Sequence, residues 1–494
     1  MNYFKNIKQF IFLILVTMLL LESCSDFLEQ EPGTQISVTE QLATKNGVLQ
    51  ALNGTYRELE ANLRSERYGT YADLQGGNIK FTPYPTTRSS RVGEIVTPTN
   101  IENIYSFDDK SVESDFASFY TGSYDIINQC NLILEFTDAL TDATEAEKNE
   151  IKAEALTIRA YSHFLLSQVY SQNYGFTENA SHLGIIYSTE SIAKGLQYPA
   201  RETAGKTYSL IIEDITTALS LYSNTLLSAG PAYSYFNAIS AKALLARVYL
   251  SKSDWKNAYD TANDVITNSG VNLMSTAEYV AQWEKQDTPV SEILLELSIP
   301  RDASTGTAGG SMFAFFGYTS ETVYNSYIAS TDLLDLYSAT DIRKQMFLEK
   351  PISTLVNNQL VKVNYYFIKK FQGNAAYVSF RLSEQYLIRA EAALKLNNND
   401  QAKTDINTIR GRANASLLTD AENLEDAIFL ERRKELCFEG HLFFDILRNK
   451  KSPSRNDGCI SLNCSPSYPS PKFVLPIPRN NIYLNANLKQ NESY

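Results

Sequence analysis

The sequence predicts a mainly α-helical protein in which two long irregular insertions interrupt a scaffold of paired helices, with minor β structure. Three observations lead to this prediction. Most of the chain beyond residue 33 repeats apolar residues at the spacing of amphipathic helices. Segments 69–107 and 270–377 are rich in Gly, Pro, Ser, Thr and aromatic residues and break that period. A content of 44% hydrophobic and 20% charged residues is typical of a globular protein, so disorder should not dominate.

The first residues resemble the export signal of a bacterial lipoprotein. Lys5 and Lys8 supply a basic start, residues 10–21 are almost entirely apolar, and Cys24 follows a small residue. The apolar run is shorter than the roughly 20 residues that a membrane-spanning helix needs. We therefore expect residues 1–23 to be a signal peptide that is removed, although an ordinary secretory signal with a chance cysteine is the alternative.

The mature chain would begin at Cys24. Two or more acyl chains on this cysteine would hold the protein stably at a membrane without a transmembrane helix. Residues 24–36 would then be a lipidated linker, and residues 37–494 a single domain that carries both insertions.

Helical periodicity marks nine segments and alternation marks two short strands. The helices are expected at 39–62, 114–139, 146–174, 205–223, 235–251, 255–268, 381–396, 400–413 and 424–448, and the strands at 292–299 and 361–371.

Two of the helix pairs resemble tetratricopeptide units. In 243–258 and again in 389–406, small residues recur on one helix face, a short polar loop follows, and a second helix begins. The two pairs are far apart, and no regular period of about 34 residues runs through the chain, so a uniform solenoid is excluded. The expected scaffold is a right-handed superhelix of such pairs, with the insertions at its surface.

Charge and cysteine content narrow the possible partners. The chain has 44 Lys and Arg against 56 Asp and Glu, and the net charge of −12 argues against nucleic acid. Cys130 and Cys437 lie in helical patterns and are expected to be buried. Cys459 and Cys464 lie in a polar loop, where an oxidising compartment would permit a disulfide, so bonded and free cysteines both stay open. Scattered histidines give no metal site.

The sequence contains no specific catalytic motif. It lacks a Gly-x-Ser-x-Gly elbow, a phosphate-binding glycine loop and a His-Glu-x-x-His pair. The Ser-x-x-Lys match at 253–256 stands without its companion motifs. A carboxylate pair for glycoside hydrolysis is defined by spatial separation, so a hydrolase stays open as a minor alternative to a non-enzymatic protein.

Several motifs, taken in order, resemble the SusD/RagB family. Each motif is modest by itself, but their order and terminal position are specific when they are taken together. The motifs are 24–29, 154–164, 241–250, 381–394, 405–413, 431–448 and 475–494. The chain departs from the family pattern at Leu442-Phe443, Asn481 and Glu492-Ser493. The polar residues of the 431–448 motif lie at helical spacing and are expected to pair within the scaffold.

This resemblance implies a lipid-anchored, surface-exposed protein of the Bacteroidetes outer membrane, partnered with a SusC-like TonB-dependent transporter. Members capture a glycan, or in some cases a peptide, without catalysis and without a cofactor. A peptide ligand stays open because the chain has only two tryptophans, Trp255 and Trp283, and sugar sites favour large exposed aromatic faces. Structural calcium is not predictable, since no loop has calcium-ligand spacing.

Aromatic and polar residues of the insertions are the candidates for ligand contact, because aromatic faces stack on sugars and polar groups fix hydroxyl geometry. Packing of the loops onto the helices is the alternative role for each of them. The candidates are Asp73, Tyr84, Arg88 and Arg91 from the first insertion and Phe315, Phe316, Tyr318, Tyr324 and Tyr327 from the second.

Overall fold

The computed structural model describes most of the chain after the N-terminal segment. The described ranges are 37–85, 91–225, 227–228, 230–285, 289, 291–297, 311–373 and 375–494. The predicted signal peptide, the predicted lipidation site Cys24 and the candidate Arg88 lie outside these ranges.

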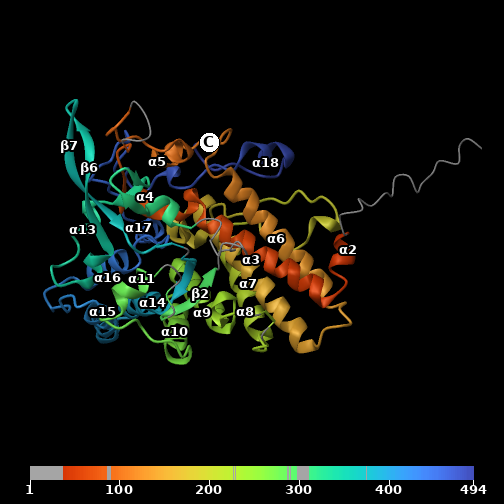
Figure 1. Cartoon of the computed structure of the whole chain (residues 1–494). Coiled ribbons are helices and arrows are strands. Elements are labelled where there is room, and N and C mark those ends of the chain that lie inside the picture. The colour runs from red at the N-terminus through yellow and green to blue at the C-terminus, as the bar shows by residue number, and fades with distance from the viewer. Residues whose placement is uncertain are drawn as a thin grey trace, which may run out of the picture.

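Within the described ranges, nine long helices form the scaffold (Figure 1). They are α3 Lys45–Arg64, α6 Ala117–Thr137, α7 Glu145–Tyr170, α8 Ala204–Leu221, α9 Ala238–Lys252, α10 Trp255–Asn268, α14 Leu382–Lys395, α15 Asn399–Arg412 and α16 Leu424–Glu435. From α6 to α10, and again from α14 to α16, each helix packs on the next, so consecutive helices are neighbours in space.

The two tetratricopeptide-like pairs, α9/α10 and α14/α15, lie side by side although the second insertion separates them in sequence. Helix α10 packs directly on α14. Small side chains make this approach possible, since Ala258 and Ala262 of α10 share a buried cluster with Ala392 of α14. The described residues that separate the two pairs in sequence therefore lie outside the helical stack and form other structure.

Each predicted helical segment is helical, with two corrections. Segment 39–62 is divided into α2 Val38–Gln41 and α3, because the Thr44 side chain accepts a hydrogen bond from the N–H of Gly47 and starts a new helix. Segment 424–448 is divided into α16 and α17 Leu442–Arg448. Between them Phe438 (φ 64°) and Gly440 (φ 82°) adopt left-handed backbone conformations, which end a right-handed helix.

The first insertion begins as helix, contrary to the expected irregular segment. Residues 69–76 belong to α4 Glu66–Gly76, which Ser65 caps and Gly77, at φ 92°, ends. Nearly all of α4 is buried, so tertiary burial stabilises a helix despite its two glycines, Gly69 and Gly76. The strand β1 Ile79–Phe81 and the short helix α5 Glu102–Tyr105 follow.

The second insertion contains more β structure than the two expected strands. The strands are β2 Ile293–Leu297, β3 Tyr318–Ser320, β4 Val323–Tyr324, β5 Tyr327–Ala329, β6 Phe347–Val356, β7 Gln359–Ile368 and β8 Tyr377–Arg381; short helices are α11 Tyr279–Trp283, α12 Phe313–Phe316 and α13 Thr331–Leu334. The short helix α18 Arg479–Leu484 lies near the C-terminus. The predicted strands correspond to β2 and β7.

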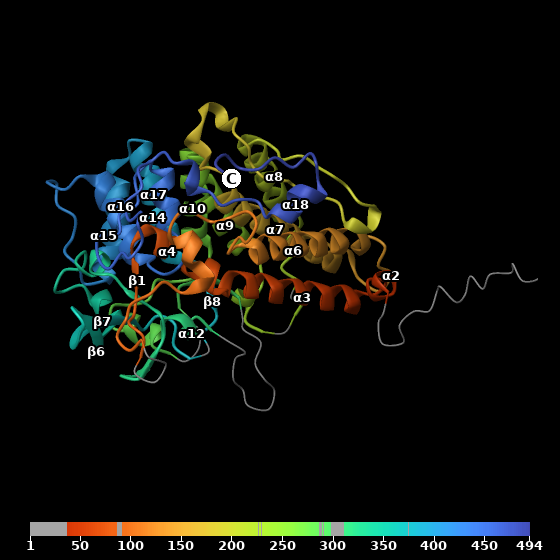
Figure 2. The ribbon, with the colours of Figure 1, turned by 90° about the horizontal axis from the view of Figure 1, so that it is seen from above.

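One sheet joins the two insertions. Its strand order is β1-β5-β7-β6, so a strand of the first insertion pairs antiparallel with a strand of the second. Strand β6 pairs with β7 along its whole length, and Asn357 and Asn358, both at positive φ, turn the chain between them. In Figure 2 this hairpin lies at the same end of the molecule as α15 and α16, away from α8.

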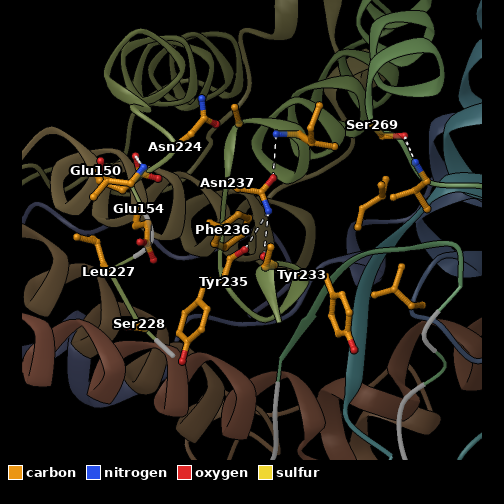
Figure 3. A pocket seen from close by; sticks show the side chains of 17 residues that line it. Glu150, Glu154, Asn224, Leu227, Ser228, Tyr233, Tyr235, Phe236, Asn237 and Ser269 are labelled. Atoms are coloured by element: carbon orange, nitrogen blue, oxygen red, sulfur yellow. Dashed lines mark hydrogen bonds between the residues drawn. The ribbon is translucent and has the colours of Figure 1, made fainter. Parts of the chain in front are cut away.

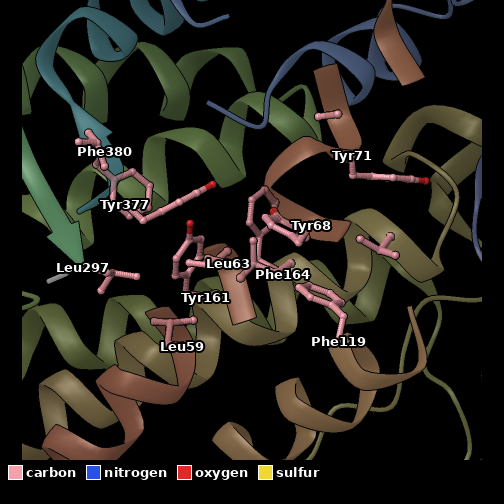
Figure 4. Close-up of a cluster of buried hydrophobic side chains, with 14 of the residues drawn as sticks. Leu59, Leu63, Tyr68, Tyr71, Phe119, Tyr161, Phe164, Leu297, Tyr377 and Phe380 are labelled. Carbon is pink, nitrogen blue, oxygen red and sulfur yellow. The ribbon is translucent and has the colours of Figure 1, made fainter. Parts of the chain in front are cut away.

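A large core holds helices and insertions together (Figure 4). Tyr68 of α4 stacks on Phe119 of α6 with ring centroids 4.7 Å apart. Leu59 and Leu63 of α3 lie in the same cluster and are fully buried. Burial of so much aromatic surface fixes the insertions on the scaffold.

Within the described ranges, no helix is long and apolar enough to cross a membrane. No group of three metal-ligating side chains occurs in this part of the chain. The sulfurs of Cys459 and Cys464 are bonded, with Cα atoms 5.9 Å apart, and Cys130 and Cys437 are free and buried.

Candidate ligand-binding cleft

A cleft of about 230 Å³ lies where the two insertions meet. Residues of β1 and the segment after it form one wall, the chain before α5 forms a second, and β4 with the residue before β5 forms a third. The lining residues are Glu66, Phe81, Thr82, Pro83, Tyr84, Pro85, Val96, Pro98, Thr99, Asn100, Tyr324 and Ser326.

Backbone hydrogen bonds build the wall that carries Tyr84. The N–H of Thr82 donates to the carbonyl of Ser326 (3.0 Å), which continues the pairing of β1 with β5. The N–H of Tyr84 donates to the carbonyl of Glu94 (2.8 Å), and the N–H of Gly93 donates back to Tyr84 (3.0 Å). Tyr84 therefore stands on paired backbone, half-buried, with its ring at the cleft.

Two buried tyrosines hold the opposite wall in place. The hydroxyl of Tyr324 donates to the carbonyl of Pro83 (3.0 Å), and that of Tyr327 donates to Oε1 of Glu66 (2.7 Å). Asn100 donates from its side-chain amide to Oε2 of Glu66. Burial raises the pKa of Tyr324 to about 12, so its hydroxyl stays protonated and remains a donor at neutral pH.

The cleft combines apolar faces with neutral polar edges. Tyrosine and proline rings supply flat apolar surface, while Thr82, Thr99, Asn100 and Ser326 supply hydroxyl and amide groups. Among the described lining residues the only charged side chain is Glu66, and hydrogen bonds occupy both of its oxygens. Such a surface suits a neutral ligand that has apolar faces and a rim of hydroxyl groups.

Comparison with known proteins shows which family has this architecture. Two family models match, one described as the SusD family over residues 314–494 and one described as "Starch-binding associating with outer membrane" over residues 26–250. Together they cover the first insertion, the later part of the second and most of the scaffold. The chain belongs to the SusD/RagB family.

Relatives in this family match along nearly the whole chain. SusD-like protein P2 of Formosa agariphila is 23% identical over 98% of this chain and 99% of its own length. The solved structure of a SusD superfamily protein from Bacteroides thetaiotaomicron is 27% identical, with a TM-score of 0.75, over 91% of this chain and 99% of its own. A putative sugar binding protein from Bacteroides vulgatus is 26% identical, with a TM-score of 0.76, over the same shares of the two chains.

The motifs that resemble the SusD/RagB family meet in the scaffold. Arg381 from the first C-terminal motif, Arg412 from the second and Glu435 from the third form one buried ion cluster with Glu292. All four side chains are almost fully buried. The scaffold role expected for the third motif is therefore confirmed for Glu435.

The structure divides the candidate ligand residues into two groups. Tyr84 and Tyr324 line the cleft, and Tyr327 lies directly behind it on Glu66. Tyr318, the strand partner of Tyr324, lines a neighbouring hollow of about 300 Å³ next to Phe367.

The remaining described candidates lie elsewhere. Arg91 is exposed and lies 3.8 Å from Glu94. Phe316 is fully buried against Tyr327, and Phe315 is partly buried against the core.

Asp73 is a correction, because it belongs to the core instead of a ligand site. It is fully buried in α4, and its carboxylate accepts hydrogen bonds from the N–H groups of Phe438 (2.9 Å) and Gly440 (3.4 Å) and from Asn78 (2.7 Å). It thereby holds the break between α16 and α17. Its position in a Gly-rich segment suggested a loop, but the segment is helical.

The sequence did not identify Glu66 and Asn100 as residues of the cleft. Glu66 precedes the expected insertion, and Asn100 stands among ordinary turn residues in Pro98-Thr99-Asn100. The proline and asparagine marked a turn, and no local signal connected it with a glutamate 34 residues earlier. Neither tryptophan lines the cleft, and Trp283 is buried beside Lys370 and Arg381.

Proposed function

We propose that this protein is a non-enzymatic glycan-binding lipoprotein of the outer membrane that captures oligosaccharides in the cleft between its two insertions. The observation that carries the proposal is the joint lining of that cleft by Tyr84, Tyr324 and neutral hydroxyl and amide groups. Sugar rings present apolar C–H faces and hydroxyl edges, which these groups match. The description of one matching family model and the name of the solved sugar-binding relative support the same ligand class.

Delivery to a transporter is the second part of the proposal. A lipid on Cys24 would tether the domain at the outer membrane surface, and a SusC-like TonB-dependent transporter would receive the ligand. Capture requires affinity without bond cleavage, so the cleft needs no acid–base pair. Glu66, the one carboxylate among the described lining residues, is occupied by Tyr327 and Asn100, which is consistent with a positioning role.

A binding screen with product analysis tests this proposal. Purified protein is titrated with neutral oligosaccharides, acidic oligosaccharides and peptides, and the same samples are analysed for released products. Saturable binding of a neutral glycan with no product is the expected result. Binding of peptides alone would replace the ligand class by the peptide alternative, and turnover of a glycan would overturn the non-enzymatic role.

A further inference from the structure

A second and larger cavity lies on the scaffold side of the molecule. It measures about 420 Å³ and is lined by α7, the described residues between α8 and α9, the first turn of α9, the end of α10 and β2 (Figure 3). No described residue lines both this cavity and the cleft between the insertions. Its volume exceeds that of the cleft, so it can hold a ligand at least as large.

Two buried carboxylates on one face of α7 line this cavity. Glu150 and Glu154 are one helical turn apart, and their side chains are 4% and 5% exposed. Oε2 of Glu150 accepts hydrogen bonds from the backbone N–H (2.7 Å) and the hydroxyl (2.9 Å) of Ser223. Oε2 of Glu154 accepts from the hydroxyl of Tyr56 (2.5 Å), which itself accepts from the N–H of Phe236 (2.8 Å). Each glutamate thus uses one oxygen for the scaffold.

Neither carboxylate has a cationic partner within the described part of the chain. Several other buried carboxylates are neutralised by arginine, as Glu435, Glu391 and Asp214 are. No Lys, Arg or His is among the described residues that line the cavity. A buried carboxylate without a counter-ion is costly, and a cation that entered the cavity would remove that cost.

Aromatic rings stand next to the two glutamates. Tyr56 contacts Tyr235 edge to face, with ring centroids 5.5 Å apart, and stacks with Phe236 at 6.3 Å. Tyr235, Phe236 and Tyr233 also line the cavity, and Figure 3 shows Glu154 extending toward Tyr235. Aromatic faces attract cations through their quadrupoles, most strongly where water is excluded.

We propose that this cavity binds the protonated amine of a small ligand, with Glu154 and Glu150 as its counter-ions and the tyrosine rings as its walls. An amino sugar and a basic amino acid carry the same ammonium group, so either could supply it. The site is independent of glycan capture in the cleft, since the two cavities have no residue in common.

The protonation state of Glu154 provides a second signature of amine binding. Burial raises the pKa of Glu154 to about 8; the hydrogen bond from Tyr56 opposes this shift and the nearby Glu150 adds to it. The empty cavity therefore holds a protonated Glu154 at neutral pH, and a bound ammonium group would displace that proton. Binding heats should then differ between buffers of different ionisation enthalpy.

Isothermal titration of the full-length protein with D-glucosamine, N-acetyl-D-glucosamine and L-lysine tests the proposal. Glucosamine, lysine or both should bind saturably at pH 7, while the acetylated sugar, which has no charge, should bind at least about tenfold more weakly. Binding of only one of the two amines would identify the source of the ammonium group. Glu154→Gln keeps the acceptor for Tyr56 and should weaken amine binding by about tenfold or more.

Two controls separate this site from other effects. Glu145→Gln changes an exposed carboxylate on the same helix and should leave amine binding unchanged. Tyr84→Ala should also leave it unchanged, so a failed glycan proposal and a failed amine proposal give different results. Equal binding of the amine and its acetylated form, no binding of either amine, or unaltered binding by folded Glu154→Gln protein would overturn the proposal. The comparison of the two amines with the acetylated sugar uses wild-type protein, so it tests the proposal even if the Glu154→Gln variant does not fold.

Discussion

Arg381 and Glu435 form a fully buried ion pair, with Nη1 of the arginine 2.7 Å from Oε1 of the glutamate. Arg412 and Arg343 contact the same carboxylate. Glu435→Gln would leave these guanidinium groups without their shared counter-ion. We expect the free energy of unfolding to fall by about 3–5 kcal/mol.

Urea unfolding followed by circular dichroism measures this loss. Glu425→Gln on the same helix is the matched control, because its carboxylate is 54% exposed and pairs with Lys395 at the surface. It should cost less than about 1 kcal/mol. Equal stability of the two variants would contradict a structural role for the buried cluster.

Tyr84 should contribute to ligand affinity and little to stability. Tyr84→Ala removes an aromatic face from the cleft and should lower the affinity for a captured oligosaccharide by about three- to tenfold. Tyr84→Phe keeps the face and should retain most of the affinity. Isothermal titration measures both, and Tyr198→Ala, an exposed tyrosine outside the cleft, is the control. A normal affinity in Tyr84→Ala would place the ligand elsewhere.

Asp73 should contribute to stability and little to ligand binding. Asp73→Ala leaves the buried N–H groups of Phe438 and Gly440 without their acceptor, so we expect a loss of about 2–4 kcal/mol in the free energy of unfolding. The affinity of the folded protein for oligosaccharide should stay within a factor of about two. A large change in affinity at unchanged stability would restore Asp73 as a ligand residue.

Two glycines should respond oppositely to alanine. A Cβ atom on Gly76 would lie 2.4 Å from Cγ of Leu442, so Gly76→Ala forces α4 and α17 apart and should cost about 1–3 kcal/mol. Gly54 lies inside α3 with no atom within 4 Å of the added Cβ. Gly54→Ala should therefore stabilise the protein by about 0.5–1 kcal/mol. Thermal unfolding of both variants checks the signs.

The stability of the protein should depend on pH through Glu154. Its pKa is about 8 in the folded protein and near 4.5 when unfolded, so between these values the folded state binds more protons. Stability from this group is complete below about pH 4.5 and is lost as the pH rises through 8. Glu154→Gln mimics the protonated form. Between pH 5 and pH 8, the free energy of unfolding of this variant should fall by about 2–4 kcal/mol less than that of the wild type.

Urea unfolding at the two pH values gives this difference directly. Other carboxyl groups titrate in the same range, so the comparison of wild type with variant isolates Glu154. Glu145→Gln should follow wild type, and identical pH profiles for wild type and Glu154→Gln would contradict the raised pKa.

Local patterns in the sequence were enough to predict the helical scaffold. The periodicity of apolar residues places α10 at 255–268, and the small-residue faces identify α9/α10 and α14/α15 as similar pairs. Both signals are local, because a helix buries one face whatever its partner is. The division of 424–448 was not predictable, since it depends on Phe438 adopting a positive φ beside Asp73.

By itself, the sequence determined the mainly helical class, the two insertions that interrupt it and the family motifs. Only the tertiary structure decided which insertion residues line a cleft, placed Asp73 and Phe316 in the core, and joined Tyr56 to Glu154 across 98 residues. The apolar periodicity of a segment reflects which of its faces is exposed to water, and this is a local property. A binding site depends on contacts between residues remote in sequence, and these form only when the whole chain packs.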